Sequence, residues 1–157
     1  MDTHEIANIV ARDKKASELF LGVFAGDQLP TKKINDDVWL LITNCCASNL
    51  PGLHWVGIFG NKDGIEFFDS YGLPPDAYPL VKLFIKSQKP KLLRYNSVQI
   101  QNVESQACGW YALFFVFNKS RGRSLETILK ALLRTKLSDY MIQDLLIMTY
   151  VNINMYY

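Results

Sequence analysis

The sequence predicts one α+β domain, residues 1–157, with a central, mainly antiparallel sheet flanked by helices. Three observations favour this class. The chain has the length of one domain, and 49% of its residues are apolar, which is enough to build a hydrophobic core. Two short apolar runs on either side of residue 62 are joined by a turn, as antiparallel strands are. Apolar stretches after residue 108 have the length of helices.

The N-terminal third is expected to supply a helix and a buried strand. Asp2 and Glu5 have the spacing of a capping box, which predicts a helix that ends at about Lys15. Residues 20–24 form a short apolar run that ends before a turn. Residues 38–43 form a continuous apolar run of strand length, which indicates a strand buried on both faces.

The next segment predicts a β-hairpin. Residues 55–59 and 65–69 are strand-like, and the turn-forming residues 61–64 lie between them. His54 then stands at the start of one strand and Asp69 at the end of the other. These two positions are neighbours across an antiparallel ladder, so the hairpin brings the two side chains together.

The second half of the chain is expected to be mostly helical. Residues 80–86 are amphipathic, and residues 97–101 alternate as a third strand would. Cys108 precedes the most apolar helix, which runs from Gly109 to about Asn118. Residues 125–137 and 138–148 are two further helical stretches, and no linker divides the chain.

Four residues together suggest a cysteine-nucleophile hydrolase. Cys108 lies at a predicted helix N-terminus, where positive potential and a neighbouring imidazolium both stabilise a thiolate. His54 is the candidate base, and Asp69 the acid that fixes its tautomer. The Gln101 amide and the backbone N–H of Cys108 are candidate oxyanion donors.

Each of these residues also has an ordinary structural explanation when it is taken alone. A single cysteine is usually a small apolar residue, and a histidine beside Trp55 can simply pack. Asp69 can be a turn residue, and Gln99 and Gln106 compete with Gln101 for the oxyanion role. The order histidine, acid, glutamine, cysteine is what favours catalysis.

The sequence indicates neither a metal site nor a bound cofactor required for the chemistry. Cys45 and Cys46 are adjacent and lack the spacing of zinc ligands, and His4 is expected to be solvated. Three cysteines in all favour a reducing compartment over a disulfide framework. No signal peptide is expected, and the longest apolar run is far shorter than the ~20 residues that span a membrane.

Charge is distributed unevenly along the chain. Residues 1–81 carry a net charge of −5, residues 82–136 one of +9, and residues 137–157 one of −2. Such asymmetry can mark a surface that binds DNA, although solvated helix faces explain it equally well. The candidate DNA-contacting residues are Lys82, Lys86, Lys89, Lys91, Arg121 and Arg123.

The chain resembles the adenovirus-type endopeptidases, the adenain family, over residues 20–118. The matching segments are residues 20–22, Pro30, residues 52–55, residues 67–72, and Gln101 with Cys108-Gly109. The resemblance implies a fold of the broad papain-like type, with the nucleophile helix packed on the sheet. It also implies a cysteine protease of a double-stranded DNA virus or virus-like element.

Further expectations follow from this resemblance. The substrates would be capsid or core precursors cleaved at Gly-Gly or Gly-X sites, in the virion and the host nucleus or cytoplasm. Activation by DNA, by a viral peptide, or by both is implied, and the protein is expected to be a monomer. The alternatives are a protease specific for ubiquitin-like proteins and a non-catalytic, DNA-binding capsid domain.

Overall fold

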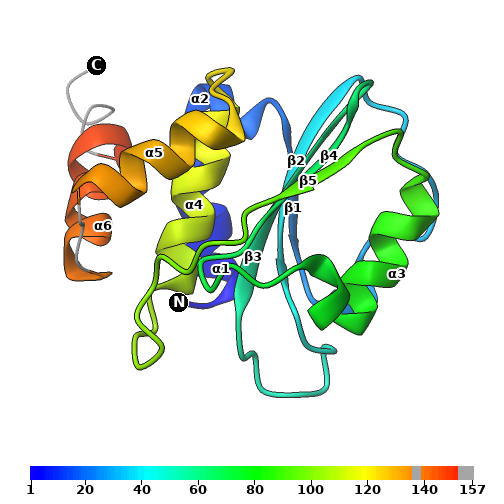
Figure 1. Cartoon of the computed structure of the whole chain (residues 1–157), viewed down its shortest axis with the longest axis horizontal. Helices are drawn as coiled ribbons and strands as arrows, with labels where there is room; N and C mark the ends of the chain where they lie inside the picture. The colour runs from blue at the N-terminus through cyan, green and yellow to red at the C-terminus, as the bar shows by residue number, and fades with distance from the viewer. Residues whose placement is uncertain (136–138, 152–157) are drawn as a thin grey trace.

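The computed structural model describes residues 1–135 and 139–151. Figure 1 shows three layers, in which the sheet separates helix α3 from the other helices. The α+β class with helices on both sides of a central sheet is confirmed.

The sheet has five strands in the order β1-β2-β3-β4-β5. They are β1 (Phe20–Phe24), β2 (Val38–Asn44), β3 (Trp55–Asn61), β4 (Gly64–Phe68) and β5 (Leu93–Tyr95). The two central pairings are antiparallel, as predicted, whereas each edge strand pairs in parallel. Parallel neighbours require a crossover, and α3 provides it between β4 and β5.

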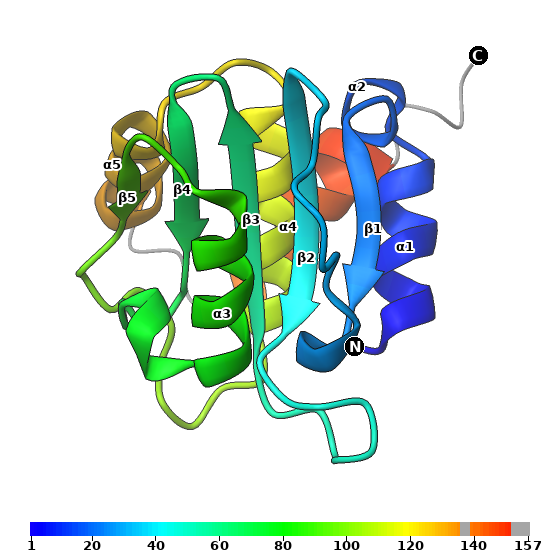
Figure 2. The same ribbon diagram turned by 90° about the vertical axis from the view of Figure 1, so that its right-hand side faces the viewer.

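The helices fall into two groups around this sheet. Helix α3 (Pro79–Gln88) covers one face alone, and Figure 2 shows it in front of the strands. The other face is covered by α1 (Thr3–Ala11), α2 (Lys14–Ser17), α4 (Cys108–Lys119), α5 (Leu125–Thr135) and α6 (Asp139–Leu146), which continues into a π-helical turn over Ile147–Val151. The predicted capping box is present, since Asp2 and Glu5 each accept a hydrogen bond from the other's backbone N–H.

Both faces of the sheet are buried, which explains the continuous apolar run in β2. Leu40 and Ile42 belong to the core beneath α4, while Trp39 and Leu41 belong to the core beneath α3. A strand that contacts helices on both sides has no polar face and therefore no alternation.

Helix α4 lies unusually close to β3 at Gly57. A Cβ atom on this glycine would come within 2.6 Å of the Phe115 ring, a distance that real Cβ atoms do not tolerate. The absence of a side chain at Gly57 therefore allows the helix to approach the strand that follows His54.

The N-terminal helix ends at Ala11 rather than at about Lys15, and Lys14–Ser17 form the separate short helix α2. The predicted strand over residues 97–101 is wrong: the backbone N–H groups of Ile100 and Gln101 both donate to the Ser70 carbonyl, and no ladder forms. Residues 136–138, where the predicted last two helices meet, lie outside the described residues, as does Lys136 of the positively charged segment.

Candidate active site

The hairpin joins His54 to Asp69. The His54 Nε2 and the Asp69 Oδ1 are 2.6 Å apart, and both side chains are buried. Because Gly57 pairs with Phe68, Asp69 lies diagonally across the ladder from His54, and the side chains bridge that offset. The predicted contact between these two residues is therefore present.

The Asp69 carboxylate is held by donors from the segment that follows it. Oδ1 also accepts the Tyr71 N–H at 2.9 Å, while Oδ2 accepts the Leu73 N–H at 3.2 Å and the Tyr78 hydroxyl at 2.8 Å. Burial, followed by the neighbouring Asp69 charge, raises the pKa of Tyr78, so its hydroxyl keeps the proton that it donates. These bonds fix the carboxylate that orients the imidazole.

Cys108 is the first residue of α4 and is buried. Burial opposes ionisation of its thiol, but His54 and the backbone N–H groups of Trp55 and Gly109 outweigh burial and lower the pKa of Cys108. The backbone thus contributes to thiolate stability at this helix N-terminus, as the sequence predicts.

The second ring nitrogen of His54 is left for this thiol. Nδ1 has no hydrogen-bond partner among the described residues, although Cys108 lies near enough for the two groups to shift each other's pKa. Burial alone would lower the pKa of His54, but its bond to Asp69 and its proximity to Cys108 raise it to about 9. The raised pKa of His54 and the lowered pKa of Cys108 both favour transfer of the thiol proton to the imidazole.

Tyr71 connects the two halves of the site. Its ring stacks on His54, with centroids 4.5 Å apart and planes 23° apart. The Tyr71 hydroxyl lies 3.4 Å from the Gln101 amide nitrogen. No local pattern in the sequence around Tyr71 predicts this stacking.

The Gln101 side chain is buried, and its groups already have partners. Its Oε1 accepts from the Ser70 hydroxyl at 2.7 Å, and its Nε2 donates to the Ser105 carbonyl at 2.7 Å. The rival Gln99 donates to the Gln101 carbonyl, and Gln106 is exposed. The oxyanion role of Gln101 stays a prediction, and it requires one Nε2 hydrogen to turn from the Ser105 carbonyl or from the Tyr71 hydroxyl to the substrate.

No family model matches the sequence. No curated protein matches it. Among solved structures, the fold is similar to the crystal structure of the selenomethionine form of the ASFV pS273R protease, with 22% identity and a TM-score of 0.41. The alignment covers 68% of this chain and 41% of that one.

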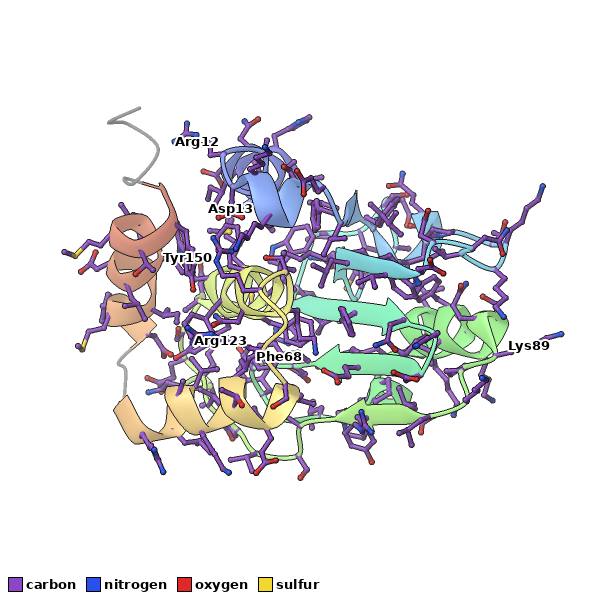
Figure 3. The ribbon with its side chains drawn as sticks, turned by 90° about the horizontal axis from the view of Figure 1, so that it is seen from above. Arg12, Asp13, Phe68, Lys89, Arg123 and Tyr150 are labelled. Carbon is purple, nitrogen blue, oxygen red and sulfur yellow. The ribbon has the colours of Figure 1, made fainter. Side chains whose placement is uncertain are left out.

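The six candidate DNA-contacting residues do not form one surface. Figure 3 shows Lys89 at the α3 end of the molecule and Arg123 among the helices on the other side. Lys82 forms an ion pair with Asp76, and Arg121 forms one with Asp13. Two of the six residues are therefore already in ion pairs with carboxylates, and the six do not lie on one positively charged face.

One group of lysines does converge. A cavity of about 290 Å³ between α3 and the β3–β4 turn is lined by Lys33, Lys62, Lys89 and Lys91, which form no ion pair with a described residue. Asp36 and Asp37 also line this cavity, so its charge is positive but mixed. It lies at the end of β3 opposite His54, roughly 20 Å away at the rise of an extended strand.

Neither a metal site nor a membrane span is found in the described part of the chain. Over residues 1–135 and 139–151, no three His, Cys, Asp or Glu side chains are grouped so that they could hold a metal ion. Within the same residues, no helix has the length and apolar character needed to cross a bilayer.

Proposed function

We propose that the chain is a cysteine endopeptidase in which Cys108 is the nucleophile and His54 the acid and base. The observation that carries this proposal is the arrangement around His54. Its Nε2 is bound to buried Asp69, and its unpaired Nδ1 is left for a thiol whose pKa is lowered.

The reaction would use these groups in sequence. The Cys108 thiolate attacks the scissile carbonyl carbon, and the oxyanion is stabilised by the Cys108 N–H and the Gln101 amide. His54 gives its Nδ1 proton to the leaving amine, and a thioester remains. Neutral His54 then takes a proton from water as the water attacks the thioester, which releases the acid and expels the Cys108 thiolate, so that the thiolate–imidazolium pair is restored.

Cys108→Ala tests this proposal. We expect it to abolish both peptide cleavage and rapid labelling by iodoacetamide, while the double variant Cys45→Ser/Cys46→Ser keeps both. Cys45 is a matched control, because burial raises the pKa of its thiol and makes it unreactive. Cleavage by Cys108→Ala, or by Cys108→Ser at nearly the wild-type rate, would contradict the assignment.

The substrates proposed are capsid or core precursors of a double-stranded DNA virus or virus-like element, cleaved at Gly-Gly or Gly-X bonds. The adenain-type segments around His54, Asp69 and Cys108 support this choice. A protease for ubiquitin-like proteins would use the same residues. A panel of ubiquitin-like fusions beside a Gly-Gly peptide separates the two, since only the alternative enzyme prefers the folded fusions.

DNA is proposed as a sequence-independent partner of the lysine-lined cavity. Four unpaired lysines there support it, because lysines neutralise phosphates without reading bases. Fluorescence anisotropy of a labelled duplex should show binding that weakens with salt. For each phosphate contact, log K should fall by about 0.9 for every tenfold rise in salt concentration. Lys33→Ala/Lys91→Ala should weaken binding, whereas Lys130→Ala, which removes a lysine already paired with Glu126, should not. Absence of binding at low salt removes DNA both as partner and as activator.

A further inference from the structure

Asn96 lies one residue beyond strand β5 and is 1% exposed. Its Oδ1 accepts the backbone N–H of Asp69 at 2.9 Å, and its Nδ2 donates to the backbone carbonyl of Asp69 at 2.6 Å. The remaining Nδ2 hydrogen is directed to the Val98 carbonyl at 3.2 Å. One side chain therefore binds both backbone groups of the candidate acid, and its amide is fully used.

This contact stands where the ladder between β4 and β5 ends. The last paired residues are Phe67 and Tyr95, so the backbone of β5 no longer holds the chain at Asp69. The Asn96 amide supplies a donor and an acceptor in the place of a strand neighbour. Few side chains carry both groups in one plane, since a carboxylate lacks the donor and an aliphatic side chain lacks both.

The residues held in this way bear on both halves of the site. Asp69 binds His54, Ser70 donates to the Gln101 side chain, and the Tyr71 ring stacks on His54. A displacement of the Asp69 backbone would therefore move the orienting carboxylate together with the support of the candidate oxyanion donor.

We propose that Asn96 is a positioning residue for the cysteine protease reaction, which acts by fixing the Asp69 backbone and through it the orientation of His54. The inference rests on the proposed function and deepens it. Asn96 touches none of the reacting groups itself, and its effect is transmitted by Asp69.

A positioning role predicts a change in proton affinity that a purely structural role does not. Asp69 raises the pKa of His54, so a loosened Asp69 should lower it. The alkaline limb of kcat/KM for peptide cleavage, which requires His54 to hold the proton that it gives to the leaving amine, should then move to lower pH. The titratable groups that surround the His54–Asp69 pair are Cys108, Tyr71, Tyr78 and Cys45.

The experiment compares Asn96→Ala with Asn118→Ala over pH 5–10. Asn118 is equally buried and donates to the Phe114 carbonyl near the far end of α4, so its loss controls for stability alone. We expect Asn96→Ala to lower kcat roughly 10- to 100-fold with KM within about twofold. We also expect its alkaline limb to fall by roughly one pH unit. Asn118→Ala should lower the Tm but leave both kcat and the limb unchanged.

The outcome that would overturn the role of Asn96 differs from the outcome that would overturn the protease assignment. If Asn96→Ala does not fold, Asn96→Ser keeps one of the two hydrogen bonds and should show an intermediate loss. A wild-type pH limb and kcat in the Ala variant, or in the Ser variant if Ala does not fold, would overturn the role of Asn96. Wild-type protein whose Cys108 reacts no faster than Cys46 would instead overturn the proposed function.

Discussion

Asp69→Asn should uncouple His54 from its orienting acid while keeping the shape of the site. The amide nitrogen of asparagine must replace either Oδ1 or Oδ2, and both oxygens accept backbone N–H donors, from Tyr71 and Leu73 respectively. If the amide nitrogen takes the place of Oδ2, the Tyr78 hydroxyl can turn and accept a hydrogen bond from it. Only the hydrogen bond from the Leu73 N–H is then lost. The oxygen then stays beside His54, but the negative charge that favours imidazolium is gone.

The magnitude follows from the pKa of His54. Loss of the whole rise from the ordinary value of 6.5 to about 9 corresponds to about 3 kcal/mol, or about two orders of magnitude in the population of the thiolate–imidazolium pair. Asp69 is the largest of the causes that raise the pKa of His54, so its loss removes much of the rise, while burial still lowers the pKa and Cys108 still raises it. We therefore expect Cys108 alkylation at pH 7 to slow by up to about 100-fold, with kcat falling in parallel.

The assay is the rate of iodoacetamide alkylation of Cys108 from pH 5 to 10, with thermal unfolding as the control for folding. Asp63→Asn, in the exposed hairpin turn, should behave as wild type. A folded Asp69→Asn protein with the wild-type pH profile would refute the idea that Asp69 sets the proton affinity of His54.

Three further outcomes are expected. Gln101→Ala should lower kcat by about 10²–10³ with little change in KM, and a comparable loss in Gln99→Ala with none at Gln101 would move the oxyanion role to Gln99. Glu66→Ala should lower the free energy of unfolding by about 3–5 kcal/mol in urea titrations, because it strands the buried ammonium of Lys119, 2.7 Å from the carboxylate. A loss no larger than that of an exposed ion pair would contradict this account. In Cys108→Ala, the free energy of unfolding should fall as pH rises above 6.5, by less than about 3 kcal/mol, since Asp69 still raises the pKa of folded His54 but the contribution of Cys108 to that rise is gone. The slope should vanish when His54→Ala is added, and a slope that persists belongs to another group.

The parts of the fold that the sequence could predict are those fixed by nearby residues. The turn at residues 61–64 and the strands beside it determine the hairpin, which places Asp69 within reach of His54. The position of Cys108 at a helix N-terminus follows from the apolar run after it. Capping by Asp2 and Glu5 is likewise local.

The parts that could not be predicted depend on contacts between distant segments. Asn96 reaches Asp69 across 27 positions, and no pattern in its own segment indicates a partner. Alternation over residues 97–101 predicted a strand, but the ladder between β4 and β5 ends at Tyr95, and the N–H groups of Ile100 and Gln101 bind the Ser70 carbonyl instead. The directions of the lysine side chains depend on how α3 packs on the sheet. Residues that follow one another in the positively charged segment of the sequence therefore lie in separate parts of the molecule.

The close approach of α4 to β3 at Gly57 has a consequence for variation in this protein. The nucleophile belongs to the helix and the base precedes the strand, so the separation of Cys108 and His54 depends on how near the two elements lie. A single added methyl group at Gly57 would push against the Phe115 ring and wedge the layers apart, three positions along the chain from His54. Such a change would leave every candidate reacting group intact and still separate the proposed nucleophile from the proposed base, so a substitution at this mid-sheet glycine should lower activity although the side chain there takes no part in the chemistry.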